Sequence, residues 1–223
     1  MRANRHSSAR LRPGCLAGIA CLLAAACAQP LPRGMAPAAP AAPDATAAAH
    51  PDAIAHALDP VHTRIVVAVD HAGFSKAIGT VSGTTGTLHL VPGQWEGARV
   101  EARIPLARLD FGDADWNRAV AGRGLLDTVR HPEAVFRSGR IEALDAGRAR
   151  IHGQLTLRGN TREVVLHAVR NAEKRHPLPP FRHTVGFSAT ATLSRADFGS
   201  SAWGSMIGDA VEVRLEVEAV RTR

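Results

Sequence analysis

The sequence contains no tyrosine, few aromatic residues of any kind, and cysteine only near its N-terminus. Aromatic residues make up 4% of the 223 residues, and the three cysteines are Cys15, Cys21 and Cys27. The chain beyond residue 27 can therefore form neither a disulfide bond nor a cysteine metal site. With 45% hydrophobic and 21% charged residues, the composition is typical of one soluble globular domain with appendages, and it excludes a polytopic membrane protein.

Acidic residues are absent before Asp44, and this asymmetry explains much of the formal net charge of +7. Four of the 27 Lys and Arg residues lie in the first 27 positions, which leaves 23 basic against 20 acidic residues in the rest of the chain. These four are Arg2, Arg5, Arg10 and Arg12. A nearly balanced surface exerts no unusual long-range attraction on phosphate groups. We therefore expect no nucleic-acid partner.

The four arginines precede a short apolar run, residues 15–27, which is about half as long as a membrane-spanning helix. This pattern predicts an export signal over residues 1–27. Its end can be interpreted in two ways. Ala26-Cys27-Ala28 fits ordinary signal peptidase and a soluble product, whereas residues 23–27 (LAAAC) resemble a lipobox with Ala24 in place of the usual Leu. In the second case Cys27 is lipidated and anchors the protein to a membrane.

Residues 28–56 are rich in Ala and Pro and show no apolar periodicity, which predicts a semi-extended linker. From residue 57 to 223 the pattern changes, because apolar and polar residues alternate with a period of two. The alternation is clearest in residues 211–219 (VEVRLEVEA) and recurs in residues 65–69, 100–104, 151–157 and 185–193. Turn signals separate about eight such strands, which predicts an all-β, closed, eight-stranded antiparallel barrel.

The alternation stops between the strands near Leu106 and Ala134, which predicts a short helical insertion. Residues 113–121 fit one helix, with Asp113 as its N-cap and Trp116, Ala119 and Val120 on one side.

The inward faces of the predicted strands are rich in Val, Ala, Gly and Leu and poor in aromatic residues. A barrel closed around such small side chains is only loosely filled by them, so we expect space inside for a ligand. The alternative is a core filled by its own side chains. The inward residues that we predict to contact a ligand are Ile65, Val67, Val69, Leu88, Leu90, Ile104, Phe136, Leu155, Phe187 and Leu215.

Several short motifs occur together in one order along residues 58–220. They include LDPVHT at residues 58–63, GQLTLRGNTR at 153–162, RADFG at 195–199 and GDAV at 208–211. As a set they resemble the YceI-like, polyisoprenoid-binding proteins of bacteria. Two positions depart from that family's pattern: Ala57 replaces a common aromatic residue, and residues 116–120 (WNRAV) replace R-D-x-H-L.

The resemblance implies an extended lipocalin-like barrel that is exported to the periplasm and holds an isoprenoid lipid or a quinone in its interior. It is also consistent with a homodimer. Beyond that bound lipid it implies no cofactor and no enzymatic activity.

The residues themselves support neither a metal site nor a catalytic triad. The 11 histidines include no His-x-His or His-x-x-x-His pair, so we expect no metal. We interpret His62, near Asp59, as a buried hydrogen-bonding residue that closes one barrel end. An enzyme with His62 or Ser205 in its chemistry remains an alternative, as does a ligand-free structural barrel.

The loop over residues 199–208 carries Trp203, Met206 and Ile207 among small residues. It can gate the cavity, touch a membrane or fold back as a plug, and the sequence does not choose among these roles.

Overall fold

The computed structural model describes residues 50–222. The predicted signal, Cys27 and most of the predicted linker lie outside the described residues. Within residues 50–222 no helix has the length and apolar character needed to cross a bilayer.

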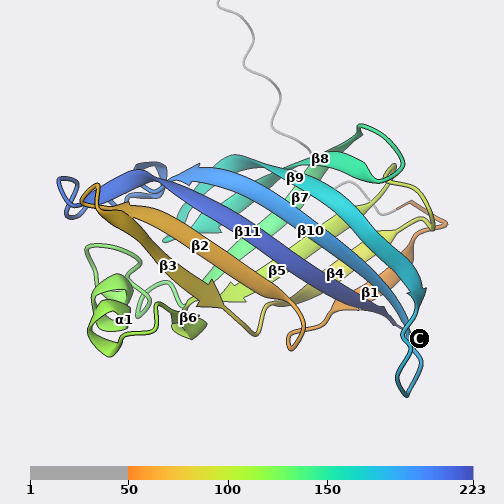
Figure 1. The fold of residues 1–223 in the computed structure, drawn as a ribbon. Coiled ribbons are helices and arrows are strands. Elements are labelled where there is room, and N and C mark those ends of the chain that lie inside the picture. Colours follow the sequence, from red (N-terminus) through yellow and green to blue (C-terminus); the bar gives the residue numbers. More distant parts are fainter. Residues whose placement is uncertain (1–49, 223) are drawn as a thin grey trace, which may run out of the picture. The chain divides into compact units, whose positions relative to one another are not determined.

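Eight antiparallel strands form a closed ring, which confirms the predicted all-β barrel (Figure 1). The ring closes because β11 pairs with β1 as well as with β10. In order around the ring, the strands are β1 (Ile54–Leu58), β4 (Thr85–Leu90), β5 (Arg99–Pro105), β7 (Glu133–Ala143), β8 (Arg148–Leu157), β9 (Asn160–Arg175), β10 (His183–Ser194) and β11 (Ile207–Arg221).

Three further strands extend the wall beyond the point where β1 ends. They are β2 (Arg64–His71), β3 (Ser75–Val81) and the two-residue β6 (Leu109–Asp110). β1 pairs with the last residues of β11, whereas β2 pairs with the first part of the same strand. β3 then pairs with β6, which follows β5 after the short helix η1 (Leu106–Arg108). One long strand, β11, therefore changes partner along its length.

The barrel has two distinct ends, which we call the helix end and the hairpin end (Figure 1). The helix end carries α1 (Ala114–Ala121), the β2–β3 turn and the loop of residues 199–206, which follows η2 (Ala196–Phe198). The hairpin end carries the loop between β9 and β10 and the C-terminus. The strands of the wall run between these two ends.

The predicted helical insertion is confirmed, including its N-cap. The Asp113 side chain accepts hydrogen bonds from the backbone N–H groups of Asp115 and Trp116, at 3.0 and 2.9 Å. This bonding satisfies two of the amides that a helix start leaves unpaired. The barrel itself begins at Ile54, inside the stretch that we predicted to be linker.

Two glycines allow aromatic rings to lie over the wall. A Cβ atom on Gly153 of β8 would stand 2.4 Å from Cζ of Phe136 on the neighbouring strand β7. A Cβ atom on Gly79 of β3 would stand 2.9 Å from Cζ of Phe111. Because glycine has no Cβ, each ring occupies the space above it and stays close to the sheet.

Candidate ligand-binding cavity

The barrel encloses a cavity of about 450 Å³, and each of the eleven strands within residues 50–222 contributes to its wall. Its lining consists of aliphatic and aromatic side chains with few polar ones among them. Four of those polar residues, Asp70, His71, Arg195 and Ser200, belong to segments at the helix end. Deeper in the barrel, the hydroxyl of the buried Thr63 donates to the carbonyl of Glu218 at 3.3 Å. The interior is therefore suited to an apolar ligand.

All ten side chains that the sequence singled out line this cavity. They project inward because alternate residues of a strand face the same side of a sheet. Their contact with a ligand stays a prediction. The ten are Ile65, Val67, Val69, Leu88, Leu90, Ile104, Phe136, Leu155, Phe187 and Leu215.

The cavity is closed at the hairpin end by Trp95, from the loop between β4 and β5. Its side chain is 5% exposed and packs against the Phe187 ring, with the ring centroids 5.5 Å apart. The Arg170 guanidinium covers the Trp95 ring at 4.8 Å from its centroid and donates to the Gln94 carbonyl at 2.7 Å. These contacts fix the indole as a floor.

The cavity opens at the helix end, where its lining residues become exposed. Trp116 is 41% exposed, Trp203 58% and Met206 52%, and all three also line the cavity. Ile207, the third residue predicted for the gate loop, lines the cavity as well. The loop thus forms part of the mouth, while its role as a gate stays a prediction.

Arg195 holds the mouth loop in place. Its guanidinium donates to the backbone carbonyls of Ser200, Ala202, Ile207 and Gly208 at 2.6 to 2.9 Å. A side chain that bonds two carbonyls of the loop and two at the start of β11 fixes the backbone path around the opening.

Sequence reasoning missed several lining residues that do not belong to alternating strands. They are Trp95 in a loop, Phe111 before α1, Leu125 and Leu126 after it, and Phe198 in η2. A usable signal existed only for Trp95, because it is one of three tryptophans in a chain poor in aromatic residues.

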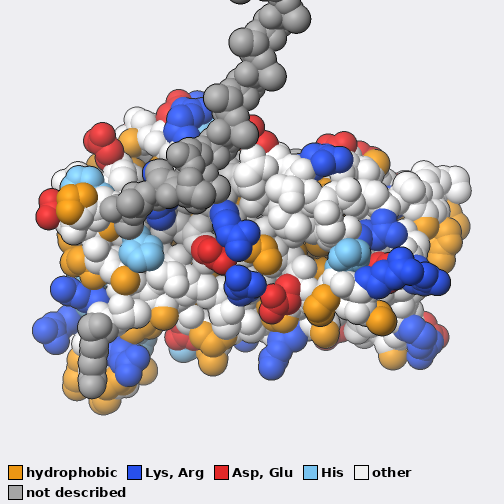
Figure 2. Space-filling model, turned by 180° about the vertical axis from the view of Figure 1, so that it is seen from behind, with side chains coloured by type: hydrophobic (Ala, Val, Ile, Leu, Met, Phe, Trp, Pro, Cys, Tyr) orange, Lys and Arg blue, Asp and Glu red, His pale blue; other side chains and the backbone are white. Residues whose placement is uncertain are grey.

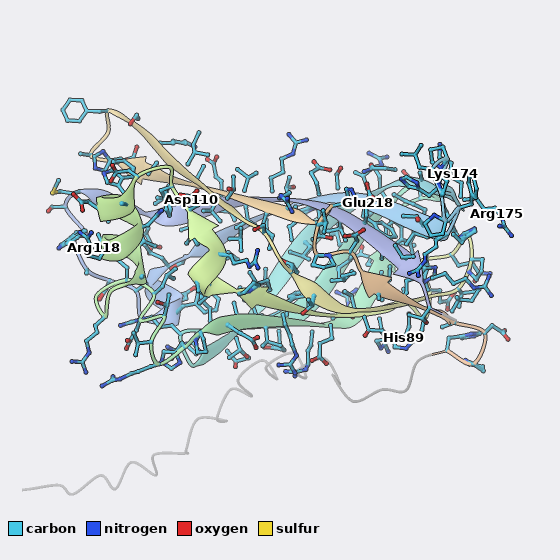
Figure 3. The ribbon with its side chains drawn as sticks, turned by 90° about the horizontal axis from the view of Figure 1, so that it is seen from below. His89, Asp110, Arg118, Lys174, Arg175 and Glu218 are labelled. Carbon is cyan, nitrogen blue, oxygen red and sulfur yellow. The ribbon has the colours of Figure 1, made fainter. Side chains whose placement is uncertain are left out.

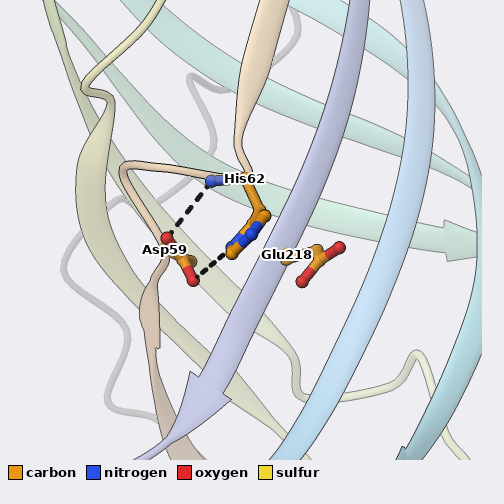
Figure 4. A group of neighbouring side chains, drawn as sticks. All are labelled: Asp59, His62 and Glu218. Atoms are coloured by element: carbon orange, nitrogen blue, oxygen red, sulfur yellow. Dashed lines mark hydrogen bonds and ion pairs between the residues drawn. The ribbon is translucent and has the colours of Figure 1, made fainter. Parts of the chain in front are cut away.

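Asp59, His62 and Glu218 form a cluster on the outside of the barrel (Figure 4). One atom of each that could coordinate a metal ion lies within 4.8 Å of the others. The Asp59 carboxylate accepts from the backbone amides of Val61 and His62 and pairs with Nδ1 of His62 at 2.8 Å. That hydrogen bond raises the pKa of His62. Burial opposes ionisation of Asp59, but the bonds from His62 and the two amides outweigh it and lower the Asp59 pKa.

The prediction that His62 is buried is wrong, because its side chain is 57% exposed. The pattern placed it near Asp59 correctly, but residues 60–62 form a turn before β2, and the His62 ring points to solvent. Both Asp59 carboxylate oxygens are already hydrogen-bonded to residues of this turn, so we assign the cluster a structural role.

His62 and Ser205 do not share a site. His62 lies beside Glu218, near the end of β11, and Ser205 lies just before the start of that strand at Ile207. About 35 Å of strand, measured along β11, lies between Ile207 and Glu218. Neither residue is among those that line the cavity.

The model of the YceI-like domain matches residues 56–219. The chain belongs to the YceI-like family. A UPF0312 protein from Pseudomonas savastanoi pv. phaseolicola is 29% identical over 138 residues, which cover 62% of this chain and 71% of the relative. A UPF0312 protein from Shewanella baltica is 28% identical over 160 residues, covering 72% and 83%.

Solved structures share the fold of this YceI-like chain at low sequence identity. BcnA from Burkholderia cenocepacia matches with a TM-score of 0.64 and 19% identity, covering 72% of this chain and 98% of that one. A polyisoprenoid binding domain from Saccharophagus degradans, implicated in plant cell wall breakdown, matches with a TM-score of 0.54 and 13% identity. That comparison covers 76% of this chain and 99% of the other.

Proposed function

We propose that this protein binds a lipid with a long isoprenoid chain inside its barrel and carries it without chemical change. The observation that carries the proposal is an apolar cavity, closed by Trp95 at one end and open at the other. Its structural neighbour from Saccharophagus degradans is described as a polyisoprenoid binding domain, which supports the same ligand class.

The cavity volume suggests how much of a chain fits. An apolar cavity of about 150 Å³ accommodates benzene, so a cavity three times larger holds about 18 carbon atoms. That number lies between three and four isoprene units. A longer chain would leave its remaining units outside the mouth.

The distribution of polar groups suggests that the ligand enters tail first. The lining side chains at the floor, such as Leu90 and Phe187 beside Trp95, are aliphatic or aromatic. The ionisable lining residues Asp70, His71 and Arg195 lie at the helix end. Burying a polar group without a partner costs roughly 2–7 kcal/mol, so a hydroxyl, quinone or phosphate head is more stable at the mouth.

A carrier must also release its ligand. Transfer of a methylene group from water into an apolar site contributes about 0.8 kcal/mol, but a bilayer shelters the same chain equally well. The net preference of the lipid for the barrel over the membrane is therefore small. Such a balance permits loading at one surface and release at another.

We also propose that the protein is exported to the periplasm, because residues 1–27 have the charge and apolar pattern of a secretory signal. Lipidation at Cys27 and formation of a homodimer belong to the same proposal. The intact mass of the mature protein, purified from the envelope, distinguishes a diacylglyceryl Cys27 from a cleaved soluble form.

Native mass spectrometry tests the ligand proposal directly. Protein loaded with farnesol or geranylgeraniol should carry one added mass of the unaltered alcohol, and solvent extraction should return that alcohol. A Phe181→Ser variant changes an exposed residue that does not line the cavity and serves as a folded comparison. A spectrum without added mass at saturating alcohol refutes lipid binding, and an altered alcohol in the extract refutes passive carriage.

A further inference from the structure

Four large apolar side chains stand exposed around the mouth of the cavity. They are Phe74, Trp116, Trp203 and Met206, and Phe74 is 91% exposed. They come from three separate segments: the β2–β3 turn, α1 and the loop of residues 199–206. We call this group the rim.

The three segments of the rim are joined by direct contacts. The backbone N–H of Ala72 donates to the carbonyl of Met206 at 2.6 Å, which ties the β2–β3 turn to the mouth loop. The Trp116 ring lies 5.1 Å from the ring of His71, at the end of β2. The rim is therefore one surface whose parts are fixed relative to one another.

We propose that the rim docks on the surface of a lipid bilayer, with the mouth of the cavity facing the membrane. This inference rests on the proposed function, because a lipid that passes from the bilayer to the cavity must cross this rim or cross water. Trp116, Trp203 and Met206 line the cavity and also reach solvent, so apolar surface is continuous from the interior to the rim. Tryptophan and phenylalanine are the side chains that favour the membrane interface.

The charges beside the rim indicate that apolar insertion drives docking. Lys76 is paired with Glu212, and Arg118 with Asp115 at 2.5 Å. Each of these two pairs is neutral and adds no attraction for anionic lipid. Docking should therefore need only a zwitterionic bilayer and should vary little with salt.

The hairpin end supplies a contrasting surface. There the exposed Leu178 and Phe181 lie in the loop between Lys174 and Arg182. Figure 3 places Lys174 and Arg175 at this end, and Figure 2 shows hydrophobic side chains beside Lys and Arg at the protruding tip. Trp95 closes the cavity on this side, so a lipid cannot enter here. Attachment through this end would be salt-dependent, because it would use Lys174, Arg175 and Arg182.

Vesicle binding of two matched variants tests the proposal. Phe74 and Phe181 are both exposed phenylalanines in turns, and neither lines the cavity. With phosphatidylcholine vesicles, Phe74→Ser should weaken partitioning about tenfold, because one interfacial side chain is lost. Phe181→Ser should partition like the unchanged protein. The opposite ranking, or equal partitioning of all three proteins, overturns the proposal.

Tryptophan fluorescence gives a second readout, because the chain has three tryptophans and no tyrosine. A variant with Trp95→Phe and Trp116→Phe reports on Trp203 alone, and one with Trp116→Phe and Trp203→Phe reports on Trp95. Vesicles of brominated phosphatidylcholine should quench Trp203 strongly and Trp95 weakly, at both 50 mM and 500 mM salt. Stronger quenching of Trp95 than of Trp203 would place the hairpin end at the membrane and refute docking by the rim.

Loading of farnesol from detergent micelles separates this inference from the proposed function. Phe74→Ser should load as much farnesol as the unchanged protein, since Phe74 lies outside the cavity. If no protein loads farnesol, the proposed function fails whatever the vesicles show. If all load it and Phe74→Ser still partitions normally, docking by the rim fails alone.

Discussion

Narrowing the cavity by one aromatic ring should shorten the isoprenoid chain that the barrel accepts. Ala189 is the suitable position, because it lies in the middle of β10 opposite Ala168 on β9 and Leu215 on β11. All three side chains line the cavity. In Ala189→Phe the added ring therefore enters the lumen.

The size of the effect follows from the volume of the cavity. If about 150 Å³ is needed for a six-carbon ring, the substitution removes one third of the 450 Å³ space, or about one isoprene unit. At about 0.8 kcal/mol per methylene from water, a four-unit prenol loses at most about 5 kcal/mol of binding free energy. A two-unit prenol fits in either cavity and should bind both proteins alike.

The assay is a series of dissociation constants for prenols of two, three and four isoprene units. Affinity should rise with length up to between three and four units in the unchanged protein, and only up to between two and three units in Ala189→Phe. Thr190→Phe provides the control, because Thr190 is the exposed neighbour whose side chain points out of the barrel. An unchanged length dependence in Ala189→Phe refutes the cavity as the site.

Thermal unfolding of the same variant tests the hollow interior without any ligand. Filling empty apolar space should leave the stability of Ala189→Phe unchanged or raised, because the ring gains contacts that a void cannot supply. Adding the ring to a packed core would instead cost about 1–3 kcal/mol. A loss of that size contradicts the cavity itself.

Three further substitutions have defined outcomes. Arg195→Met should lower the free energy of unfolding by about 3 kcal/mol, since four carbonyls in residues 200–208 lose their donor, and should speed amide exchange in residues 199–208. The raised pKa of His62 stabilises the fold below about pH 6.5, and this contribution fades as pH rises through the folded-state pKa. Urea unfolding should therefore give His62→Gln a free energy of unfolding about 0.5 kcal/mol below that of the unchanged protein at pH 5, and an equal one at pH 9. Burial lowers the pKa of His56, so the unfolded state takes up a proton before the folded state does, and the free energy of unfolding falls as pH drops below 6.5. Between pH 7 and pH 5, His56→Gln should therefore lose less stability than the unchanged protein in urea unfolding.

Controls exist for each of these variants. Arg195→Lys keeps one charged donor and should fall between the unchanged protein and Arg195→Met. The two histidine pKa values are shifted in opposite directions, so the two substitutions should change the pH dependence of stability in opposite ways. The same pH dependence in His62→Gln, His56→Gln and the unchanged protein would contradict both pKa assignments. Equal amide exchange in the mouth loop of Arg195→Met would show that other contacts hold it.

The strands were predictable wherever one face is buried and the other is solvated. Residues 211–219 alternate without a break, and they form the central part of β11. β1 was missed because its five residues, IAHAL, follow an Ala-rich stretch and are too short to show a period. Its existence depends on pairing with β11 and β4, which are distant in the sequence.

The lining of the cavity was predictable for the same reason, and its two ends were not. Alternation identifies which side of a strand faces inward, so the ten strand residues could be named. Trp95 and Phe111 reach the cavity from a loop and from the segment before α1, where no period exists. The exposure of His62 also escaped prediction, because a turn sets the direction of a side chain through its backbone geometry and not through its neighbours in sequence.

The hollow itself depends on which residues become neighbours across strands. Composition indicates that most lining side chains are small, but it does not determine whether the few aromatic rings fill the interior of the barrel. The register of β7 on β8 places Ser138 opposite Gly153 and Phe136 opposite Leu155, and the Phe136 ring then lies over Gly153. With a Cβ at residue 153, the ring would meet it at 2.4 Å and the Arg137 carbonyl oxygen at 2.6 Å, so both the ring and the backbone of β7 would have to shift. A glycine on one strand therefore allows the aromatic ring on the next strand to lie close to the wall of the barrel.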